Sequence, residues 1–480
     1  MQSISTKRAQ VELHGFASLG EPERAIATYE EVNHRRRGLM LKYRDFIGPM
    51  SPFLEIGANA GHTSYMVANT FGADGFALDL SADALRYGAM LRERWGMTRS
   101  PVRVTGDGAN LPFRDGSLRM VMAFQTITQF PDIERLIQEV HRVLAPGGMF
   151  VFGEEPLRRL LSLRLYYCPY PETMKPWERK LHEWGLLGYL IRDVVGSQQE
   201  EICGIRQNYS LDLRQWRILL NKYFADCKLE VFVHERGWGE RIVKRLAVRL
   251  DPYRSQWRAA RLLGGTLAAF CRKAGEPPQE EPPFNDSFER YLRCPACRGT
   301  LERDAENALR CACGFESRPD DGVYMLLPPS DQAELYPADD RPDTIDFCRP
   351  GHEKRLMEGW GGLEGVFGAR YRWIGRNAVC YLTRTRSGPM RLRIRGYAPE
   401  RIFGQRGGVH IEATAQWKRI GQWKLTRPGL FVLEAQLPEG TGYRIEIKAS
   451  PVWQAPGDVR PLSVNISLVR MVPAGPGRPA

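Results

Sequence analysis

Short apolar runs alternate with amphipathic stretches over the first part of the chain, up to about residue 273. Apolar runs bounded by turn residues are typical of strands buried on both faces of a sheet, and helical spacing marks the stretches between them. This alternation predicts an α/β fold with a largely parallel sheet. The predicted strands cover residues 53–57, 75–79, 102–106, 118–124, 147–152 and 228–234, and the predicted helices cover residues 22–46, 62–71, 132–144, 211–224 and 239–263.

The pattern changes after residue 273. A Pro/Glu-rich run over 274–283 cannot hold a helix and predicts a spacer. Further on, two-residue alternation such as MRLRIRGY and YRIEIKAS is broken by Gly and Pro turns, which predicts an all-β sandwich of jelly-roll-like type. Its predicted strands cover 371–381, 390–397, 408–416, 430–437, 442–450 and 462–471. We therefore expect a multidomain chain: 1–273 with an insertion at 156–210, a linker at 274–290, a cysteine-containing segment at 291–328, a linker at 329–364, and the sandwich at 365–473.

The composition excludes several broad classes. A chain of 480 residues is longer than a domain with a single hydrophobic core, so we expect several domains. A composition of 43% hydrophobic and 26% charged residues is typical of neither a disordered nor a fibrous protein. No apolar run approaches a membrane span and the first residues lack a secretory core, so we expect a cytoplasmic protein. The net charge of +12 is spread over many Arg residues, which favours a solvated basic surface over a nucleic-acid groove.

The first predicted strand runs into a glycine-bounded turn, Gly57 to Gly61, followed by a helix. Glycine lets backbone approach a ligand closely, although a tight turn in any α/β protein would look the same. The next two strands end at Asp79 and Asp107. Asp79 lies about twenty residues beyond the glycines, where a carboxylate can bind a ribose diol, and Asp107 can accept from an adenine amino group. Since parallel strands end at one edge of a sheet, these residues predict a nucleotide site there.

Four motifs in this order, LEIGANAGHTS, the acid of FALDLS, GDGANLPF and RVLAPGGMFVF, resemble those of class I S-adenosylmethionine-dependent methyltransferases over residues 50–155. The resemblance implies S-adenosylmethionine as cofactor and a Rossmann-like domain. It implies Glu55, Gly57, Ala58, Asn59 and Gly61 around the methionine part, Asp79 on the ribose, Leu80 against adenine, Asp107, Gly108 and Ala109 at the adenine edge, and Phe124, Gln125 and Thr126 beside the methyl group.

A sulfonium is a strong methyl donor, so orienting the acceptor does much of the catalysis. A hydroxyl acceptor also needs its proton removed, and the candidate bases are Glu154, Glu155 and His182. Each has a structural role as its alternative. The insertion at 156–210 is rich in Tyr, Trp and Pro, and we expect it to build the acceptor pocket or its lid; core packing or a homo-oligomer interface are the alternatives.

Four of the ten cysteines lie close together, as Cys294-Pro-Ala-Cys297 and Cys311-Ala-Cys313. Two such turns can give Zn²⁺ four thiolates and leave no open coordination position, so the predicted site is structural. The second pair is CxC and not CxxC, and a metal-free ribbon is the alternative. The segment 291–328 resembles the small zinc-ribbon family that partners many methyltransferases, including those that act on tRNA and translation factors.

The last segment carries a long motif with GDVRPLSVNI at its centre. It resembles C-terminal modules of bacterial glycosyltransferases and methyltransferases of cell-surface polysaccharide assembly. We expect Trp417, Trp423 and Trp453 to pack in the core, with stacking on sugar rings as the alternative, and Asp458 and Arg460 to form a turn-fixing pair.

Together these features predict a methyltransferase whose acceptor is a hydroxyl on a glycan or on its lipid- or nucleotide-linked precursor. Two alternatives remain. An RNA or translation-factor methyltransferase is favoured by the net charge of +12 and by the cysteine segment. A non-catalytic carbohydrate-binding scaffold would keep the fold without the reaction.

Overall fold

The computed structural model describes most of the chain as two compact units. The first holds the described residues from Ile26 to Leu335 together with Lys7 and Val11, and the second holds those from Tyr336 onward together with residues 22–25. In the part of the chain so described, no helix has the length and apolar character needed to cross a membrane. The described residues are 22–130, 132–157, 211–232, 265–276, 287–336, 341–349, 351–366, 369–403, 408–426, 428–454 and 460–473, with Lys7, Val11, Trp177, Lys180, Arg241, Ile242, Arg245 and Phe284.

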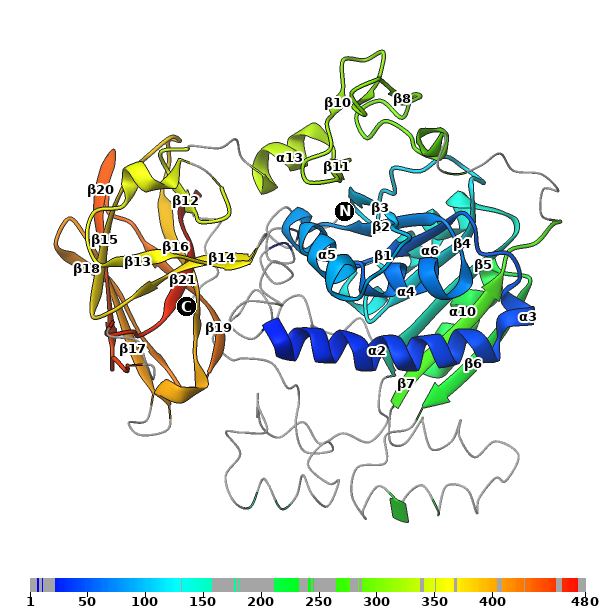
Figure 1. Ribbon diagram of the computed structural model, residues 1–480, viewed down its shortest axis with the longest axis horizontal. Helices are drawn as coiled ribbons and strands as arrows, with labels where there is room; N and C mark the ends of the chain where they lie inside the picture. Colours follow the sequence, from blue (N-terminus) through cyan, green and yellow to red (C-terminus); the bar gives the residue numbers. More distant parts are fainter. Residues whose placement is uncertain are drawn as a thin grey trace. The chain divides into compact units, whose positions relative to one another are not determined.

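One sheet of eight strands forms the centre of the first unit (Figure 1). Its order is β11-β3-β2-β1-β4-β5-β7-β6, with β1 (Phe53–Ile56), β2 (Gly75–Asp79), β3 (Val102–Thr105), β4 (Leu118–Phe124), β5 (Leu144–Leu157), β6 (Asp226–Phe232), β7 (Gly265–Arg272) and β11 (Val323–Met325). β7 runs antiparallel to β5 and β6, and the other pairs are parallel. The predicted α/β fold with a largely parallel sheet is confirmed. The strand order reverses beside β1, where open α/β sheets bind ligands.

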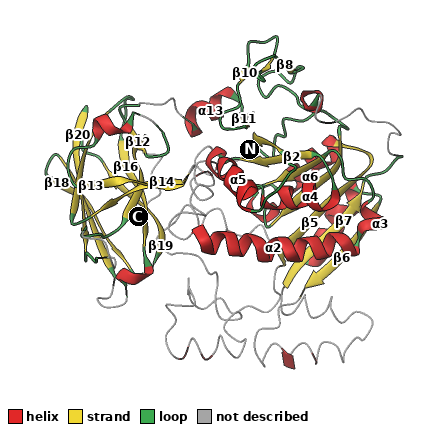
Figure 2. Ribbon diagram, in the orientation of Figure 1, coloured by secondary structure: helices red, strands yellow, loops and turns green. Residues whose placement is uncertain are grey.

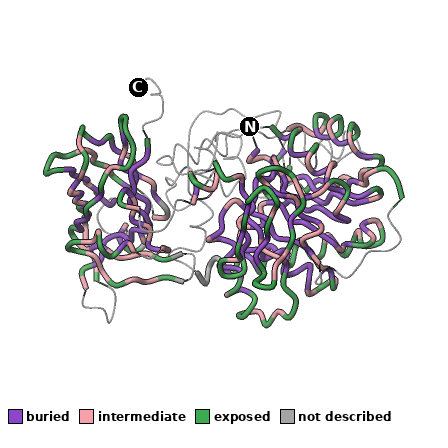
Figure 3. The backbone as a smooth tube through the Cα atoms, turned by 90° about the horizontal axis from the view of Figure 1, so that it is seen from above, coloured by how far each residue is buried: buried purple, intermediate pink, exposed green. Residues whose placement is uncertain are grey.

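The central strands β1 and β4 are buried along their whole length, because helices cover both faces of this sheet. Figure 3 shows the backbone of the first unit coloured by burial, with many buried residues in its interior. In β1, Leu54 and Ile56 join one core and Phe53 joins the other. The first core is covered by α6 (Ile133–Val143) and α10 (Leu213–Tyr223), and the second by α2 (Pro22–Lys42), α3 (Arg44–Ile47) and α4 (His62–Phe71). A further helix, α5 (Ala82–Arg94), packs along β2 and β3.

The segment 291–328, which we call the cysteine module, is built on a small antiparallel sheet. After the short helix η3 (Phe288–Tyr291), its strands are β8 (Glu302–Arg303), β9 (Leu309–Arg310) and β10 (Glu316–Ser317). Leu292, Leu309 and Phe315 belong to the same buried cluster as the large sheet, and β11 is itself a strand of that sheet. The cysteine module therefore shares the core of the first unit, although the sequence predicted a domain of its own.

The second unit consists of two antiparallel sheets around one core (Figure 2). Along β20, Tyr443, Ile445 and Ile447 enter the core and Arg444 and Glu446 do not, so the predicted two-residue alternation is present. One sheet has the order β13-β14-β21-β16-β19 with β12 beside β21, and the other has the order β15-β20-β17-β18. Their bounds are β12 (Thr344–Asp346), β13 (Trp360–Val366), β14 (Ala369–Ile374), β15 (Asn377–Thr383), β16 (Met390–Ala398), β17 (Val409–Ala415), β18 (Lys418–Leu425), β19 (Gly429–Gln436), β20 (Gly442–Ser450) and β21 (Asn465–Pro473).

The second unit also differs from the prediction. The stretch 329–364, expected to be a linker, contains α13 (Pro329–Leu335), β12, η4 (His352–Arg355) and β13. The single strand predicted over 371–381 is two strands, β14 and β15, because the chain turns at Gly375, where an added Cβ would meet the Pro461 carbonyl oxygen at 2.8 Å. Asp458 and most of the helix predicted over 239–263 lie outside the described residues, and Arg460 pairs with Glu364 at 2.8 Å.

The three tryptophans for which the sequence predicted a core position divide into two groups. Trp423 and Trp453 pack against the core, as expected. Trp417 is 74% exposed, so its predicted core position is wrong. It lies in the turn between β17 and β18, where both Gln416 and Trp417 have positive φ, 51° and 63°. A bulky residue in this region is uncommon, and here the turn displays the indole outside the sheet.

Candidate active site

The strand ends predicted to form the site lie together at one edge of the large sheet. Gly57 follows β1 with φ +70°, and a Cβ there would lie 2.4 Å from Thr126 Oγ1. Only glycine therefore fits where the turn after β1 passes the end of β4. Gly61, with φ +74°, lies in the left-handed region directly before α4. Ala58 is fully buried and its N–H donates to the Leu78 carbonyl oxygen at 2.9 Å, which ties the turn to β2.

Strained backbone accompanies the same strand ends. Asn59 after β1, Gln125 after β4 and Glu154 in β5 have φ values of 52°, 53° and 61°. Left-handed non-glycine residues cost about 1 kcal/mol or more each and cluster at functional sites. At Glu154 the pairing of β5 with β7 is also irregular, between Phe152 and Glu155. Three adjacent strands thus carry strain at the edge where a ligand is expected.

The two predicted carboxylates are buried and fixed by backbone. Asp79 Oδ2 accepts from the Asn59 N–H and Oδ1 from the Ser81 N–H, both at 2.8 Å. Asp107 Oδ1 accepts from the Ala109 N–H at 2.8 Å, and Oδ2 is 2.6 Å from Lys7 Nζ.

The residues that flank the two aspartates leave little space. A Cβ on Gly108 would lie 2.7 Å from the Phe130 ring, so this loop also requires close backbone approach. Leu80 follows Asp79 directly and is partly exposed. The structure therefore brings the predicted ribose and adenine positions to one edge of the sheet.

Glu55 lies within β1, below the glycine turn. Its carboxylate is buried and accepts from Ser64 Oγ at 2.5 Å. Burial raises the pKa of Glu55 to about 7, and the nearby Arg36 guanidinium opposes part of that rise. The side chain therefore joins β1 to the first turn of α4, the two elements that flank the glycine turn.

A polar layer on α2 covers the start of α4, and sequence analysis named none of its residues. Tyr29, Asn33 and Arg36 share one helix face by their spacing. The Tyr29 ring stacks on His62 with centroids 4.3 Å apart, and its hydroxyl lies 3.4 Å from Asn59 Oδ1. Asn33 Nδ2 donates to the His62 carbonyl oxygen at 3.0 Å. The helix predicted over 22–46 thus contacts the glycine turn through identified side chains.

Arg36 connects this layer to the end of β5. Its Nη1 lies 2.7 Å from Thr63 Oγ1 and 3.2 Å from His62 Nε2, and its Nη2 lies 2.6 Å from Glu154 Oε2. The guanidinium also stacks on the Phe124 ring at 4.5 Å. Glu154, predicted as a base, therefore lies at the site with an arginine salt bridge, and any proton transfer there would occur beside that guanidinium.

His62 is a buried neutral ring in the same layer. Burial, reinforced by the Arg36 guanidinium, lowers the pKa of His62 well below its usual value. Because Nε2 accepts from Arg36, the proton of the neutral ring is assigned to Nδ1. In the described structure this Nδ1 has no hydrogen-bond partner. Its position directly after Gly61 is the only signal in the sequence that could have indicated it.

Glu155 has a different role from the predicted one. It is fully buried, and it accepts from the backbone N–H groups of Thr126, Ile127 and Thr128, at 2.7 to 3.1 Å, and from the Thr128 hydroxyl at 3.0 Å. Burial raises the pKa of Glu155, and these donors oppose the rise. With its acceptor positions so used, Glu155 braces the turn after β4 and is not placed to act as a base. His182 lies outside the described residues.

The four cysteines of the module converge on one point. Their Sγ atoms all lie within 4.8 Å of one another, with Cys294–Cys313 at 3.7 Å and Cys297–Cys311 at 3.4 Å. Tetrahedral Zn²⁺ with bonds of about 2.3 Å separates its sulfurs by about 3.8 Å. The donor set and its spacing therefore fit zinc. A backbone N–H from Phe315 lowers the pKa of Cys313 to about 7, which favours its thiolate, whereas burial raises the pKa of Cys294 to about 12. A metal would therefore displace the Cys294 proton on binding.

Comparison with known proteins assigns the region around the site. Residues 54–152 match the family model described as a methyltransferase domain. Norajmaline N-methyltransferase from Rauvolfia serpentina is 30% identical over 128 residues, 27% of this chain and 41% of the relative. Sarcosine/dimethylglycine N-methyltransferase from Halorhodospira halochloris is 29% identical over 108 residues, 22% of this chain and 39% of the relative. A solved arsenic(III) S-adenosylmethionine methyltransferase from Chlamydomonas reinhardtii has 20% identity and a TM-score of 0.29, over 49% of this chain and 66% of that chain.

These comparisons confirm the predicted methyltransferase domain. The chain spans less than half the length of the two curated relatives. The residues matched by the family model contain β1 except Phe53, β2 to β4, most of β5 and both predicted aspartates. The cysteine module and the second unit lie outside the matched residues.

Proposed function

We propose that this chain, which carries an S-adenosylmethionine-dependent methyltransferase domain, methylates a hydroxyl group on a glycan or on its lipid- or nucleotide-linked precursor. The observation that supports donor binding is the buried Asp79 at the end of β2, whose carboxylate accepts from Asn59 in the glycine turn and from Ser81 after β2. The proposal of a glycan acceptor is supported by residues of the second unit.

The bound donor supplies an activated methyl group, and the chain's residues hold and orient it. A carboxylate offers about four acceptor positions, so Asp79 can bind ribose hydroxyls while it keeps its two backbone bonds. Gly57 and Gly61 let the backbone lie against the donor. Arg36 and Phe124 close the end of β4 beside the expected methyl position, which favours exclusion of water and in-line orientation of the acceptor.

An exposed aromatic pair on the second unit supports a sugar acceptor. Trp417 is 74% exposed and Tyr381 is 46% exposed, and each neighbours Arg444: the guanidinium lies 5.8 Å from the indole, and Tyr381 is its cross-strand partner. Exposed aromatic faces beside hydrogen-bonding side chains suit sugar rings. Glu358 and Glu446 pair with Arg444, so its charge is balanced, which favours hydroxyls over phosphates.

The acceptor class is tested with the full chain, a labelled methyl donor and a fractionated host lysate. A glycan acceptor gives label that is released by glycosidases and survives nucleases. Label that nucleases remove, or binding that weakens steeply with salt, would favour the RNA alternative that the net charge of +12 suggests. If calorimetry detects no donor binding by folded protein, the scaffold alternative replaces the enzyme.

We also propose that Cys294, Cys297, Cys311 and Cys313 hold one structural Zn²⁺, because four converging thiols leave no open coordination position. Metal analysis of purified protein is expected to give about one zinc per chain. Cys297→Ser with Cys311→Ser should remove it, while Cys348→Ser, a thiol of the second unit, should retain it. A folded double variant with unchanged zinc content would contradict the assignment.

A further inference from the structure

The chain reaches the cysteine module along one flank of a single loop of the first unit and leaves along the other. This loop, residues 106–111, contains Asp107, Gly108 and Ala109, and we call it the adenine loop. It begins directly after β3, where the Gly106 N–H donates to the Asp79 carbonyl oxygen at 3.0 Å. The cysteine module therefore adjoins the predicted adenine edge.

The incoming arm pairs with the residues that follow the adenine loop. Leu292 forms an antiparallel bridge with Phe113, the Arg114 N–H donates to the Tyr291 carbonyl oxygen at 2.9 Å, and the Arg293 N–H donates to the Pro112 carbonyl oxygen at 3.1 Å. Leu292 is fully buried. The next residue after Arg293 is Cys294, so the arm is continuous with the first thiol.

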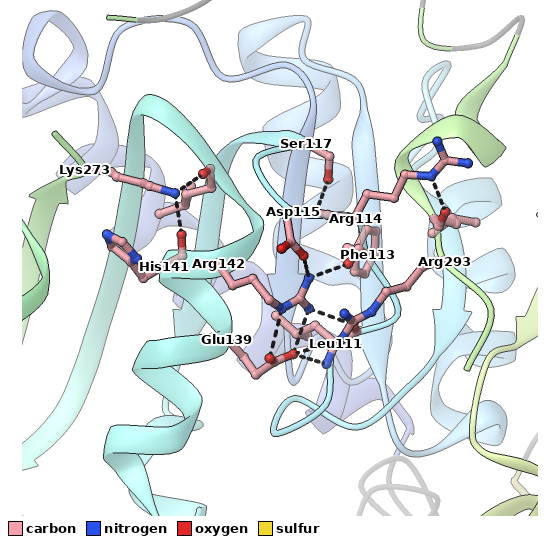
Figure 4. Close-up of polar contacts among 12 residues, drawn as sticks. Leu111, Phe113, Arg114, Asp115, Ser117, Glu139, His141, Arg142, Lys273 and Arg293 are labelled. Atoms are coloured by element: carbon pink, nitrogen blue, oxygen red, sulfur yellow. Dashed lines mark hydrogen bonds and ion pairs between the residues drawn. The ribbon is translucent and has the colours of Figure 1, made fainter. Parts of the chain in front are cut away.

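The side chain of Arg293 reaches the end of the adenine loop itself (Figure 4). Its Nε donates to the Leu111 carbonyl oxygen at 3.2 Å, which also accepts from Arg142 at 3.1 Å. The Leu111 N–H donates to Glu139 at 2.8 Å, and both arginines pair with that carboxylate. Both polar groups of the Leu111 backbone are thus held, in part by a residue of the cysteine module.

The outgoing arm pairs with the strand that precedes the adenine loop. β11 extends the large sheet beyond β3, with Val323 opposite Arg103 and Met325 opposite Thr105. The Leu326 N–H donates to the Thr105 carbonyl oxygen at 3.0 Å. Within the described residues β11 is the strand that covers this edge of the sheet, which would otherwise end at β3.

A buried lysine joins the adenine loop to the helix after the outgoing arm. Lys7 Nζ lies 2.6 Å from Asp107 Oδ2 and 2.6 Å from Asp331 Oδ2, in α13. Two carboxylates drawn to one ammonium would repel each other without it. The predicted adenine ligand is therefore attached to the part of the chain that leaves the cysteine module.

We propose that metal at the four cysteines and S-adenosylmethionine at the adenine loop bind cooperatively. The metal would join Cys294, at the end of the incoming arm, to Cys311 and Cys313, from which the chain continues to β10 and β11. These two strands are also linked to each other, since Ser317 Oγ in β10 accepts from the Met325 N–H in β11 at 2.8 Å. A metal that cross-links the two arms would hold both flanks of the adenine loop. The loop would then lose less conformational entropy when the nucleoside binds, so the nucleoside would bind more tightly. The inference rests on the proposed function and adds a positioning role for Arg293.

The test compares zinc-loaded and chelator-treated full chain by calorimetry with S-adenosylhomocysteine. Removal of zinc should weaken binding by about tenfold, and saturating S-adenosylhomocysteine should raise zinc affinity by the same factor, because coupling is reciprocal. Equal affinity of folded zinc-free and zinc-loaded protein overturns the proposal, as does a purified chain that binds no zinc. A zinc-loaded chain that does not bind S-adenosylhomocysteine would instead refute the proposed function.

A variant separates this coupling from loss of folding on chelation. Arg293→Ala keeps the four thiols and removes the contacts to Leu111 and Glu139, so zinc content should be unchanged while S-adenosylhomocysteine binds several-fold more weakly. The matched control is Arg318→Ala, an exposed arginine whose recorded ion pairs are with Glu306 and Glu316 of the cysteine module itself. Equal affinities of the two zinc-loaded variants would also overturn the proposal.

Discussion

Backbone N–H groups hold the carboxylates at the strand ends. Asp79 and Glu155 each accept from at least two of them, and Asp107 accepts from one and pairs with Lys7. A buried carboxylate is unfavourable without hydrogen-bond partners, so the surrounding turns and side chains offset the cost of burying these groups. Since the bonds come from the strand ends themselves, each carboxylate is oriented before any ligand binds.

Removing the Asp79 carboxylate should therefore affect donor binding more than folding of the whole unit. We expect Asp79→Ala to weaken S-adenosylhomocysteine affinity by about tenfold or more, the usual effect of losing hydrogen bonds to a charged group. Isothermal calorimetry measures the affinity, and thermal unfolding checks the fold. Asp226→Ala, an exposed aspartate of β6, is the control. Unchanged affinity in Asp79→Ala would mean that β2 does not end at the ribose.

Glu55 predicts a pH dependence of stability. Its pKa rises from 4.5 to about 7 on burial in the folded state, so the folded protein keeps a proton that the unfolded chain releases. The stabilisation is complete below pH 4.5 and is lost as pH rises through about 7. In the unmodified protein, the contribution of Glu55 to the free energy of unfolding falls by up to about 1.4 kcal/mol per pH unit in this window. Glu55→Gln has no titrating group at this position, so its free energy of unfolding should lack this fall. Urea titrations across this pH range measure it, and identical slopes in both proteins would refute it.

Residues close together in the sequence were predictable, and those that meet only in the fold were not. The glycine turn, Asp79 and Asp107 each follow a predicted strand, so their common location was predictable. Arg36, His62 and Glu154 come from three distant segments, and nothing in their local sequence links them. Exposure of Trp417 depends on a turn conformation that the residue types Gln-Trp do not indicate.

At the scale of secondary-structure elements, α2 shows how one helix face organises the site. Tyr29, Asn33 and Arg36 hold the glycine turn and the start of α4, and Arg36 also reaches β5. Met40, on the same helix, is fully buried against the sheet. The helix is therefore anchored by apolar packing and positioned by its polar residues.

Removing the Arg36 side chain should lower the stability of the fold. Arg36→Ala removes the partner of Glu154 and the donor to His62, so we expect the free energy of unfolding to fall by about 3 kcal/mol, as when a buried ion pair loses one member. Arg37→Ala changes the neighbouring exposed arginine and should have an effect within about 0.5 kcal/mol. Chemical denaturation compares the two. Equal losses would show that the Arg36 contacts do not stabilise the site.

The elements that sequence analysis missed are short or paired with distant segments. β11 has three residues, too few for a periodic pattern, and its partner β3 lies more than two hundred residues earlier. β7 pairs antiparallel with β5 in a sheet expected to be mostly parallel. β18 contains Gly421, which interrupts the alternation that marks a strand. In contrast, β1, β2 and β4 are predominantly apolar runs between turns, and the positions of β1 to β4 were predicted closely.

At the scale of the whole molecule, each unit has its own hydrophobic core. The core of the first unit includes apolar residues of the cysteine module, whereas the core of the second is built from its two sheets and from Ile345 and Phe347 of the stretch expected to be a linker. The division therefore falls near residue 336 and not at 365. A truncation at 365 would remove most of the second unit but leave β12 and most of β13 without the sheet they pair with.

Removing the second unit at its own boundary should preserve cofactor binding and reduce methylation of the acceptor. A chain of residues 1–335 retains the large sheet, both aspartates and all four clustered cysteines, so its S-adenosylhomocysteine affinity should stay within about twofold of the full chain. Methylation of the natural acceptor should fall by about tenfold or more if the second unit supplies acceptor binding. In the full chain, Trp417→Ala should raise KM for that acceptor with little change in kcat, since it removes a contact made before and during transfer. If the truncated chain methylates the acceptor as well as the full chain, the second unit takes no part in choosing it.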